Sequence, residues 1–142
     1  MVLRNDRGQL LAAAGWSLLH WDSTQVELLA MQYIPFLIQD WMFEAAGLIV
    51  EGDNRAIVEA MQCLTEARHW ESHPLSGEDF NWTKLFHRVF FNHIPRDCNA
   101  AAHFCAHLAL NCDFKWLFAD RDTDAIPSIF WDILWSDVSL FS

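Results

Sequence analysis

The sequence is poor in basic residues. Nine lysines and arginines stand against nineteen aspartates and glutamates, which gives a formal net charge of -10. Such a chain repels phosphate backbones and lacks the long-range attraction that free nucleic-acid binders use, so nucleic acid is a disfavoured partner. The chain also lacks any apolar run of the roughly 20 residues needed to cross a bilayer, and Arg4, Asp6 and Arg7 are untypical of a signal peptide. We expect an intracellular protein without a membrane span, in the cytoplasm or nucleus; a mitochondrial location is left open.

Glycine and cysteine are also scarce. The five glycines are scattered and form no phosphate-binding loop, and no serine or cysteine lies in a recognisable nucleophile elbow, so nucleotide binding and covalent catalysis are unsupported. Four cysteines are too few for a disulfide framework, and we expect reduced thiols. Cys98, Cys105 and Cys112 recur every seven residues, which predicts one stripe of core packing if a single helix carries all three.

Aromatic residues, by contrast, are abundant. The chain of 142 residues has eight tryptophans and eleven phenylalanines, and 53% of it is hydrophobic. This length suits a single domain, which we place over residues 1–142, but one small core hides only part of so much apolar surface. We expect an oligomer interface or a bound partner to cover the remaining apolar surface, because interface cores are enriched in aromatic residues. Stacking on nucleic-acid bases would need a basic groove beside the tryptophans.

The pattern of apolar residues predicts alternating strands and helices. Turn residues between two apolar runs predict a β-hairpin over residues 2–14. Apolar steps of three and four predict a helix from Ser23 or Thr24 to about Ala46, kinked at Pro35. The run LIVEGD is typical of a buried parallel strand and ends at Asp53. The other expected elements are a helix over 55–64, a loop over 67–79, a helix over 80–87, a strand over 88–94, a helix from about 97, and an arm followed by a short helix from about 127.

Four segments, in order, resemble one known family. VLRNDRG is similar to its second-strand turn, VELLAMQ to its first helix, VEGDNRAIVEAM to its "ESD" strand and helix, and NHIPRDCNAAAHFCAHLAL to its closing element. The chain thus resembles the plant ribonuclease H-like family found at the ends of non-LTR retrotransposon reverse transcriptases. The resemblance covers about residues 1–110 and leaves 111–142 as an aromatic-rich C-terminal arm. It implies an α/β, ribonuclease H-like fold in which a mixed sheet is flanked by helices.

The resemblance also implies a chemistry: hydrolysis of phosphodiesters by two divalent cations held by four carboxylates. Glu27 matches the first-helix glutamate, Asp53 the strand aspartate and His93 the loop histidine. The aspartate of the closing helix falls on His103, whose imidazole replaces neither the charge nor the hardness of a carboxylate toward Mg²⁺. The family's first strand, with its aspartate, has no counterpart in this sequence. We interpret Glu27, Asp53, His93 and His103 as the family's catalytic positions in degenerate form.

The strand without a counterpart lies at the centre of the family's sheet, so its loss leaves two unpaired strand edges. The hairpin then closes directly on LIVEGD, a second copy pairs with it, or a partner protein adds a strand. We therefore favour a catalytically inactive, domesticated, retrotransposon-derived pseudoenzyme without a cofactor. It would bind another protein, or itself as an oligomer, through an exposed sheet edge and an aromatic surface, and so sequester, neutralise or scaffold its partner.

The alternative is a divalent-metal-dependent ribonuclease acting on RNA/DNA hybrids. It would hold Mg²⁺ or Mn²⁺ at Glu27 and Asp53, with further ligands from a second chain or solvent, and use His93 as proton shuttle. A nuclease should also have a Lys/Arg cluster near Asp53, for which the chain offers only Arg55, Arg96 and either Lys84 or Arg88. A third interpretation is that the chain is a fragment of a longer protein that contains the first strand.

Two histidine pairs have the four-residue spacing of zinc ligands. His103 and His107 share one face of a predicted helix, and His69 and His73 repeat the spacing in a predicted loop. A zinc site needs two more converging ligands, and the resemblance to the family's closing helix already accounts for position 103. We therefore favour structural or solvated roles for these histidines.

Overall fold

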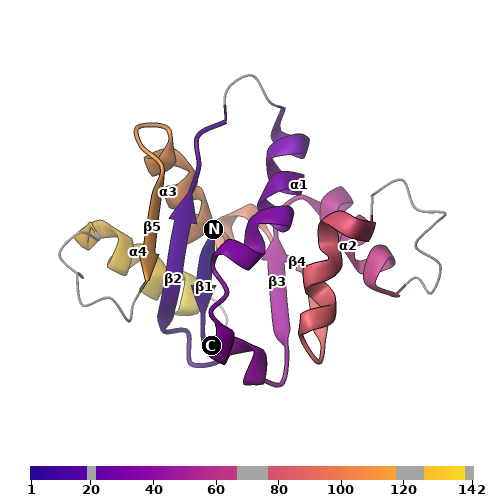
Figure 1. Ribbon diagram of the computed structural model, residues 1–142. Helices are drawn as coiled ribbons and strands as arrows, with labels where there is room; N and C mark the ends of the chain where they lie inside the picture. Colours follow the sequence, from indigo (N-terminus) through magenta and orange to yellow (C-terminus); the bar gives the residue numbers. More distant parts are fainter. Residues whose placement is uncertain (19–21, 67–76, 118–126, 140–142) are drawn as a thin grey trace. The chain divides into compact units, whose positions relative to one another are not determined.

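The computed structural model describes residues 1–18, 22–66, 77–117 and 127–139. The chain divides into two compact units (Figure 1). The terminal unit comprises Met1–His20 and Pro95–Ser142, and the central unit comprises Trp21–Ile94. None of the described helices is both long and apolar enough to cross a membrane.

The terminal unit contains an antiparallel sheet in the order β1-β2-β5. The predicted hairpin is confirmed: the Asn5 carboxamide accepts hydrogen bonds from the backbone of Arg7 and Gln9, and Gly8 has the positive φ of 76° that a tight turn requires. The predicted C-terminal arm forms a strand that pairs with β2. The predicted helix after Pro127 is confirmed. The elements of this unit are β1 (Val2–Arg4), β2 (Leu10–Gly15), η5 (Arg96–Cys98), α3 (Ala100–Ala109), β5 (Phe114–Leu117) and α4 (Ser128–Ser139).

Small residues let α3 pack closely on β2. A Cβ added to Gly15 would lie 2.8 Å from the Ala109 Cβ and 2.9 Å from the Cys105 carbonyl oxygen. Phe130 of α4 is fully buried and stacks on Phe104 of α3 at a centroid distance of 5.5 Å. Burial raises the pKa of the Cys105 thiol to about 11, against a smaller opposing effect of the chain's amino terminus.

The predicted cysteine stripe is wrong as a whole. α3 ends at Ala109, so Cys98 precedes the helix and Cys112 follows it. Cys105 is buried, Cys98 is half-buried and Cys112 is exposed. Only Cys105 packs in the core as the sequence pattern predicted, because the helix is too short to carry the other two.

The central unit contains the parallel pair β3-β4, with α1 and α2 packed against each other. The predicted long helix is wrong beyond Tyr33. Pro35 lacks the N–H that a continuing α-helix needs, and the chain passes into two short 3-10 helices. The N-cap is Asp22, whose carboxylate accepts from the Gln25 backbone N–H at 2.8 Å, and not Ser23 or Thr24. The elements are α1 (Ser23–Tyr33), η1 (Ile34–Phe36), η2 (Asp40–Glu44), β3 (Leu48–Gly52), α2 (Arg55–Glu66), η4 (Gly77–Leu85) and β4 (Val89–His93).

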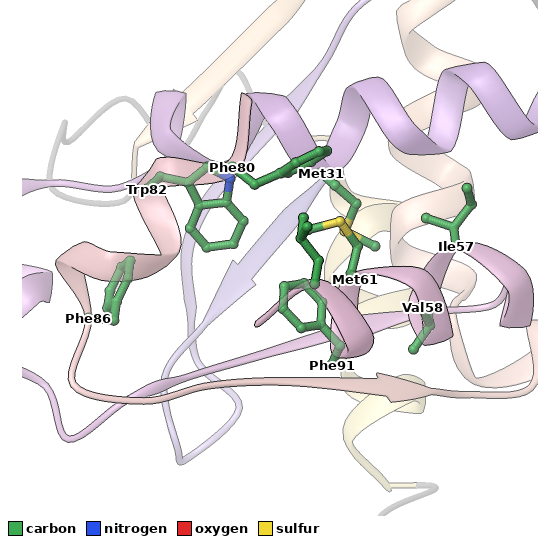
Figure 2. Close-up of a cluster of buried hydrophobic side chains, with 9 residues drawn as sticks. Met31, Ile57, Val58, Met61, Phe80, Trp82, Phe86 and Phe91 are labelled. Atoms are coloured by element: carbon green, nitrogen blue, oxygen red, sulfur yellow. The ribbon is translucent and has the colours of Figure 1, made fainter. Parts of the chain in front are cut away.

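The core of the central unit lies between α1, α2, η4 and the inner face of β4 (Figure 2). Met61 of α2 is fully buried at its centre, and Trp82 packs edge-on against Phe86 and Phe91. Among the described residues, the Trp82 indole N–H is buried without a hydrogen-bond partner. The whole cluster comprises Met31, Ile57, Val58, Met61, Leu64, Phe80, Trp82, Phe86 and Phe91.

The strand LIVEG is parallel as predicted but is buried on one face only. Its residues alternate between half-buried and exposed until Gly52, and Ile49 keeps 61% of its surface exposed. The two units together have the predicted α/β, ribonuclease H-like fold class, with antiparallel and parallel strand pairing. Within the described ranges β3 pairs with β4 alone.

Candidate functional site

Asp53 and His93 meet at the C-terminal end of the parallel strands. Gly52 is the register partner of His93, and Asp53 follows directly. The Ile94 N–H donates to the Gly52 carbonyl at 2.9 Å, which continues the ladder past the strand end. His93 Nε2 lies 3.2 Å from the backbone carbonyl oxygen of Asp53. Because a carbonyl only accepts, Nε2 is the protonated nitrogen in this contact, and Nδ1 is the nitrogen left to act as a base.

The local sequence explains how Asp53 is held. Asn54 caps α2, since its side-chain oxygen accepts from the Ile57 N–H at 3.3 Å. Gly52 lets the strand end come close to two helices: a Cβ there would lie 3.2 Å from Val58 Cγ2 and 3.6 Å from Met31 Cε. Asp53 is half-buried as a result, while His93 is exposed.

Glu27 belongs to the same unit. It lies one turn before Met31 on α1, and residues four apart share a helix face. Met31 packs near Gly52, so Glu27 occupies the face of α1 that is turned toward β3 and α2. Its side chain is half-buried, whereas the neighbouring Val26 is exposed. The central unit thus carries three of the four predicted positions: Glu27, Asp53 and His93.

The fourth position is on the other unit. His103 is half-buried on α3 of the terminal unit, and His107, one turn later, is exposed. His69 and His73 lie outside the described residues. In the ranges that the structure describes, no three His, Cys, Asp or Glu side chains form a group that could hold a metal ion.

The donor chemistry does not fit the two-metal site that the family implies. Glu27 and Asp53 offer the hard oxygen ligands that Mg²⁺ and Mn²⁺ prefer, but His103 offers a nitrogen where the family has a carboxylate. Two carboxylates fall short of the four that clamp two cations.

The described basic side chains of the central unit are split between the two ends of the β3-β4 pair. Arg55, exposed at the start of α2, is near Asp53 in sequence. Arg88 precedes β4, and its carbonyl accepts from the Leu48 N–H at the N-terminal end of the sheet. Lys84 and Arg88 line a cavity of about 340 Å³ with Gln62, Glu66 and His87. Arg96 belongs to the terminal unit. The cluster that a nuclease would need at Asp53 thus reduces to Arg55 among the described residues of this unit.

One residue of the sheet region has no signal in the sequence. Gln62 of α2 accepts a hydrogen bond from the Phe91 N–H of β4 at 3.1 Å through its side-chain oxygen. Its side-chain nitrogen donates to Glu66. A glutamine in an amphipathic helix is ordinarily a solvent-facing residue, so only the structure reveals that it covers a strand edge.

Comparison with known families decides the relationship. A family model described as reverse transcriptase-like matches residues 1–109. The chain belongs to the reverse transcriptase-like family. This is a ribonuclease H-like family of retroelements, so the resemblance of the four sequence segments is confirmed at that level. Searches of curated proteins and of solved structures found no match. The plant origin, the missing strand and the loss of catalysis stay predictions.

Proposed function

We propose that this reverse transcriptase-like chain is a catalytically inactive, ribonuclease H-like protein that binds another protein or a second copy of itself. The observation that carries the proposal is the outer edge of β3, which pairs with no strand in the described ranges. An unpaired edge is a template for a strand from another chain. Its biological role would be to sequester, neutralise or scaffold the partner.

Exposed apolar side chains in the central unit support this role. Ile49 and Phe90 are register partners on adjacent strands, and they keep 61% and 49% of their surfaces exposed. Phe36 and Trp41, between α1 and β3, are 58% and 56% exposed. Large side chains of this kind cost free energy in water and are enriched in the cores of protein interfaces.

The charge distribution weighs against nucleic acid as the partner. The net charge of -10 repels a phosphate backbone. Among the described residues of the central unit, Arg55 is the basic residue near Asp53 in the sequence. A nuclease active site needs positive charge at the scissile phosphate, either from metal ions or from basic side chains. His103 also supplies none of the negative charge that would hold such ions.

One observation favours a second candidate function, the metal-dependent ribonuclease. His93 Nε2 lies 3.2 Å from the backbone carbonyl oxygen of Asp53, and Glu27 is on the face of α1 that carries Met31, which packs near Gly52. In this alternative the two carboxylates would hold Mg²⁺ or Mn²⁺, His93 would serve as proton shuttle, and a second chain or solvent would supply the remaining ligands. The substrate would be RNA in an RNA/DNA hybrid.

A cleavage assay separates the two functions. Mg²⁺ and Mn²⁺ are titrated into the purified chain by calorimetry, and a labelled RNA/DNA hybrid is incubated with the same samples. We expect neither saturable metal binding nor cleavage. Asp53→Asn is compared with Asp40→Asn, a matched change of an exposed carboxylate in the same unit. Cleavage that Asp53→Asn abolishes and Asp40→Asn preserves would establish the ribonuclease and reject the proposal.

A further inference from the structure

The two edges of the β3-β4 pair differ, and this difference identifies the binding surface within the proposed function. The Leu48 N–H donates to the Arg88 carbonyl, and the Gly52 carbonyl accepts from the Ile94 N–H. In a parallel ladder the peptide groups of one strand alternate in direction, so Leu48, Val50 and Gly52 face β4. Ile49 and Glu51 therefore direct their N–H and C=O groups away from β4.

The outer edge of β4 is already covered. Its Phe91 N–H, which also points away from the partner strand, donates to the Gln62 side chain of α2 at 3.1 Å. The side-chain nitrogen of Gln62 also donates to the exposed Glu66. An added strand would have to displace Gln62. No strand pairs with the β3 side in the described ranges, so β3 is the edge that can accept one.

The exposed face of this edge has a distinct chemical pattern. Ile49 and Glu51 point to the same face, since side chains two residues apart lie on one side of a strand. Ile49 and its register partner Phe90 form an exposed apolar pair, and Glu51 beside them is exposed and acidic. A strand laid along β3 would thus place one side chain beside Ile49 and another, two positions away, beside Glu51.

Charge decides between the two possible occupants. A second copy would bring a second net charge of -10 to the edge and place it against Glu51, with exposed Glu44 shortly before the strand and Asp53 directly after it. Like charges across paired strands are destabilising, and opposite charges across them are stabilising. A basic segment of another protein is complementary to this edge, and a second copy is not.

We propose that the outer edge of β3 binds an extended, basic segment of a partner protein, with an apolar residue beside Ile49 and a lysine or arginine beside Glu51. The partner's backbone completes the hydrogen bonds of the Ile49 and Glu51 peptide groups. The apolar residue covers the Ile49 and Phe90 pair, and the cation neutralises the carboxylate. The edge of β3 would then recognise a partner segment in which an apolar and a basic residue are separated by one position. This inference rests on the proposed function and names its surface and its partner.

The test uses synthetic peptides and the full chain. The probe is a nine-residue peptide with blocked ends, in which valine and lysine alternate on one face and threonine fills the other. One control peptide has glutamate in place of lysine. A second carries N-methyl groups on alternate backbone nitrogens, which removes the donors that would pair with β3 and leaves charge and side chains unchanged. Binding is measured by fluorescence anisotropy at low and high salt.

Two variants of equal charge isolate the edge. Glu51→Lys reverses the carboxylate on β3, and Glu59→Lys makes the same change on the exposed face of α2. We expect saturable binding of the lysine peptide, weakened roughly three- to tenfold by Glu51→Lys and at most about twofold by Glu59→Lys. The glutamate peptide and the N-methylated peptide should bind at least roughly tenfold more weakly, because they lose the ion pair or the backbone hydrogen bonds.

Three results of the peptide assay would overturn the inference. The lysine peptide fails to saturate, the N-methylated peptide binds as well as its parent, or the two variants weaken binding equally. Sedimentation of the wild type and of Glu51→Lys tests for a second copy. A wild-type dimer whose stability Glu51→Lys changes in either direction would assign the edge to a second copy and overturn the inference. Absence of both peptide binding and hybrid cleavage rejects this surface and leaves an inactive binding protein with another interface. Cleavage that depends on Asp53 rejects the proposed function itself.

Discussion

The outer edge of β4 is covered by the side chain of Gln62, and removing that side chain should lower the free energy of unfolding measurably. Gln62→Ala deletes the acceptor of the Phe91 N–H, a bond of 3.1 Å beside a residue that is only 5% exposed. A buried donor left without a partner costs about 1–3 kcal/mol. Alanine returns a few tenths of a kcal/mol through its higher helix propensity.

The surroundings of Gln62 narrow this range. Gln62 lines the open cavity of about 340 Å³ beside β4, so water can reach the orphaned N–H after the substitution and satisfy part of its bonding. The cost should therefore fall in the lower half of the range, about 1–2 kcal/mol. Glu66→Ala is the matched control, because it removes the other partner of Gln62 at an exposed position and should cost at most about 0.5 kcal/mol.

Urea unfolding followed by far-UV circular dichroism measures both variants, and amide exchange at Phe91 reports the edge directly. We expect the Phe91 amide to exchange faster in Gln62→Ala and at an almost unchanged rate in Glu66→Ala. Equal stabilities of the two variants, or unchanged Phe91 exchange in Gln62→Ala, would refute the idea that this side chain closes the sheet.

Further predictions concern the two cores. Gly15→Ala places a Cβ 2.8 Å from the Ala109 Cβ and should destabilise the terminal unit by about 1–3 kcal/mol in urea unfolding. Gly52→Ala places its Cβ 3.2 Å from Val58 Cγ2 and should destabilise the central unit clearly less. The reverse order of the two losses would contradict the packing. Burial raises the pKa of Cys105 from 9.0 to about 11, so between these values the native state binds more protons than the unfolded state. The free energy of unfolding should therefore fall by about 2–3 kcal/mol as the pH rises through this range. Urea titrations at pH 8 to 11 should show this slope in the wild type and not in Cys105→Ala. Trp82→Phe removes a buried N–H that has no partner among the described residues, which should stabilise the protein by roughly 1–3 kcal/mol. This gain should largely offset the stability lost with the packing of the larger ring. A net loss of stability well above about 2 kcal/mol in thermal unfolding would show that the indole N–H is hydrogen-bonded.

Local chemistry made the small elements predictable. The hairpin follows from Asn5 and Gly8, whose side-chain bonds and positive φ suit a tight turn. The helix after Asn54 and the helix after Pro127 begin where capping and proline preferences place them. The meeting of Asp53 and His93 follows from the parallel strands, because the C-terminal ends of neighbouring parallel strands lie at one edge.

The two errors in the secondary structure have different causes, one local and one tertiary. Apolar spacing continues through Leu37 and Trp41, so periodicity alone extended α1 past Pro35, where the backbone cannot remain α-helical. The apolar run LIVEG indicated burial on both faces, yet the exposed Ile49 shows that only one face is packed. How many neighbours a strand has is a property of the whole sheet and is not encoded in five residues.

The edge contact of Gln62 could not be predicted for a similar reason. It joins residues 29 positions apart, and neither a glutamine on a helix nor a phenylalanine on a strand signals the pairing. Family resemblance located Glu27, Asp53, His93 and His103 by alignment of motifs. It also predicted an unpaired edge at LIVEGD, but it gave no sign that Gln62 covers the opposite edge of the β3-β4 pair.

Amide exchange along β3 tests the central claim most directly. In the free protein, resolved by NMR, the amides of Ile49 and Glu51 should exchange at least roughly tenfold faster than those of Val50 and Gly52, which face β4. Adding the lysine peptide should slow the first pair and leave the second almost unchanged. Equal protection of all four amides in the free protein would contradict the account, because the edge proposed to bind a partner would already be paired.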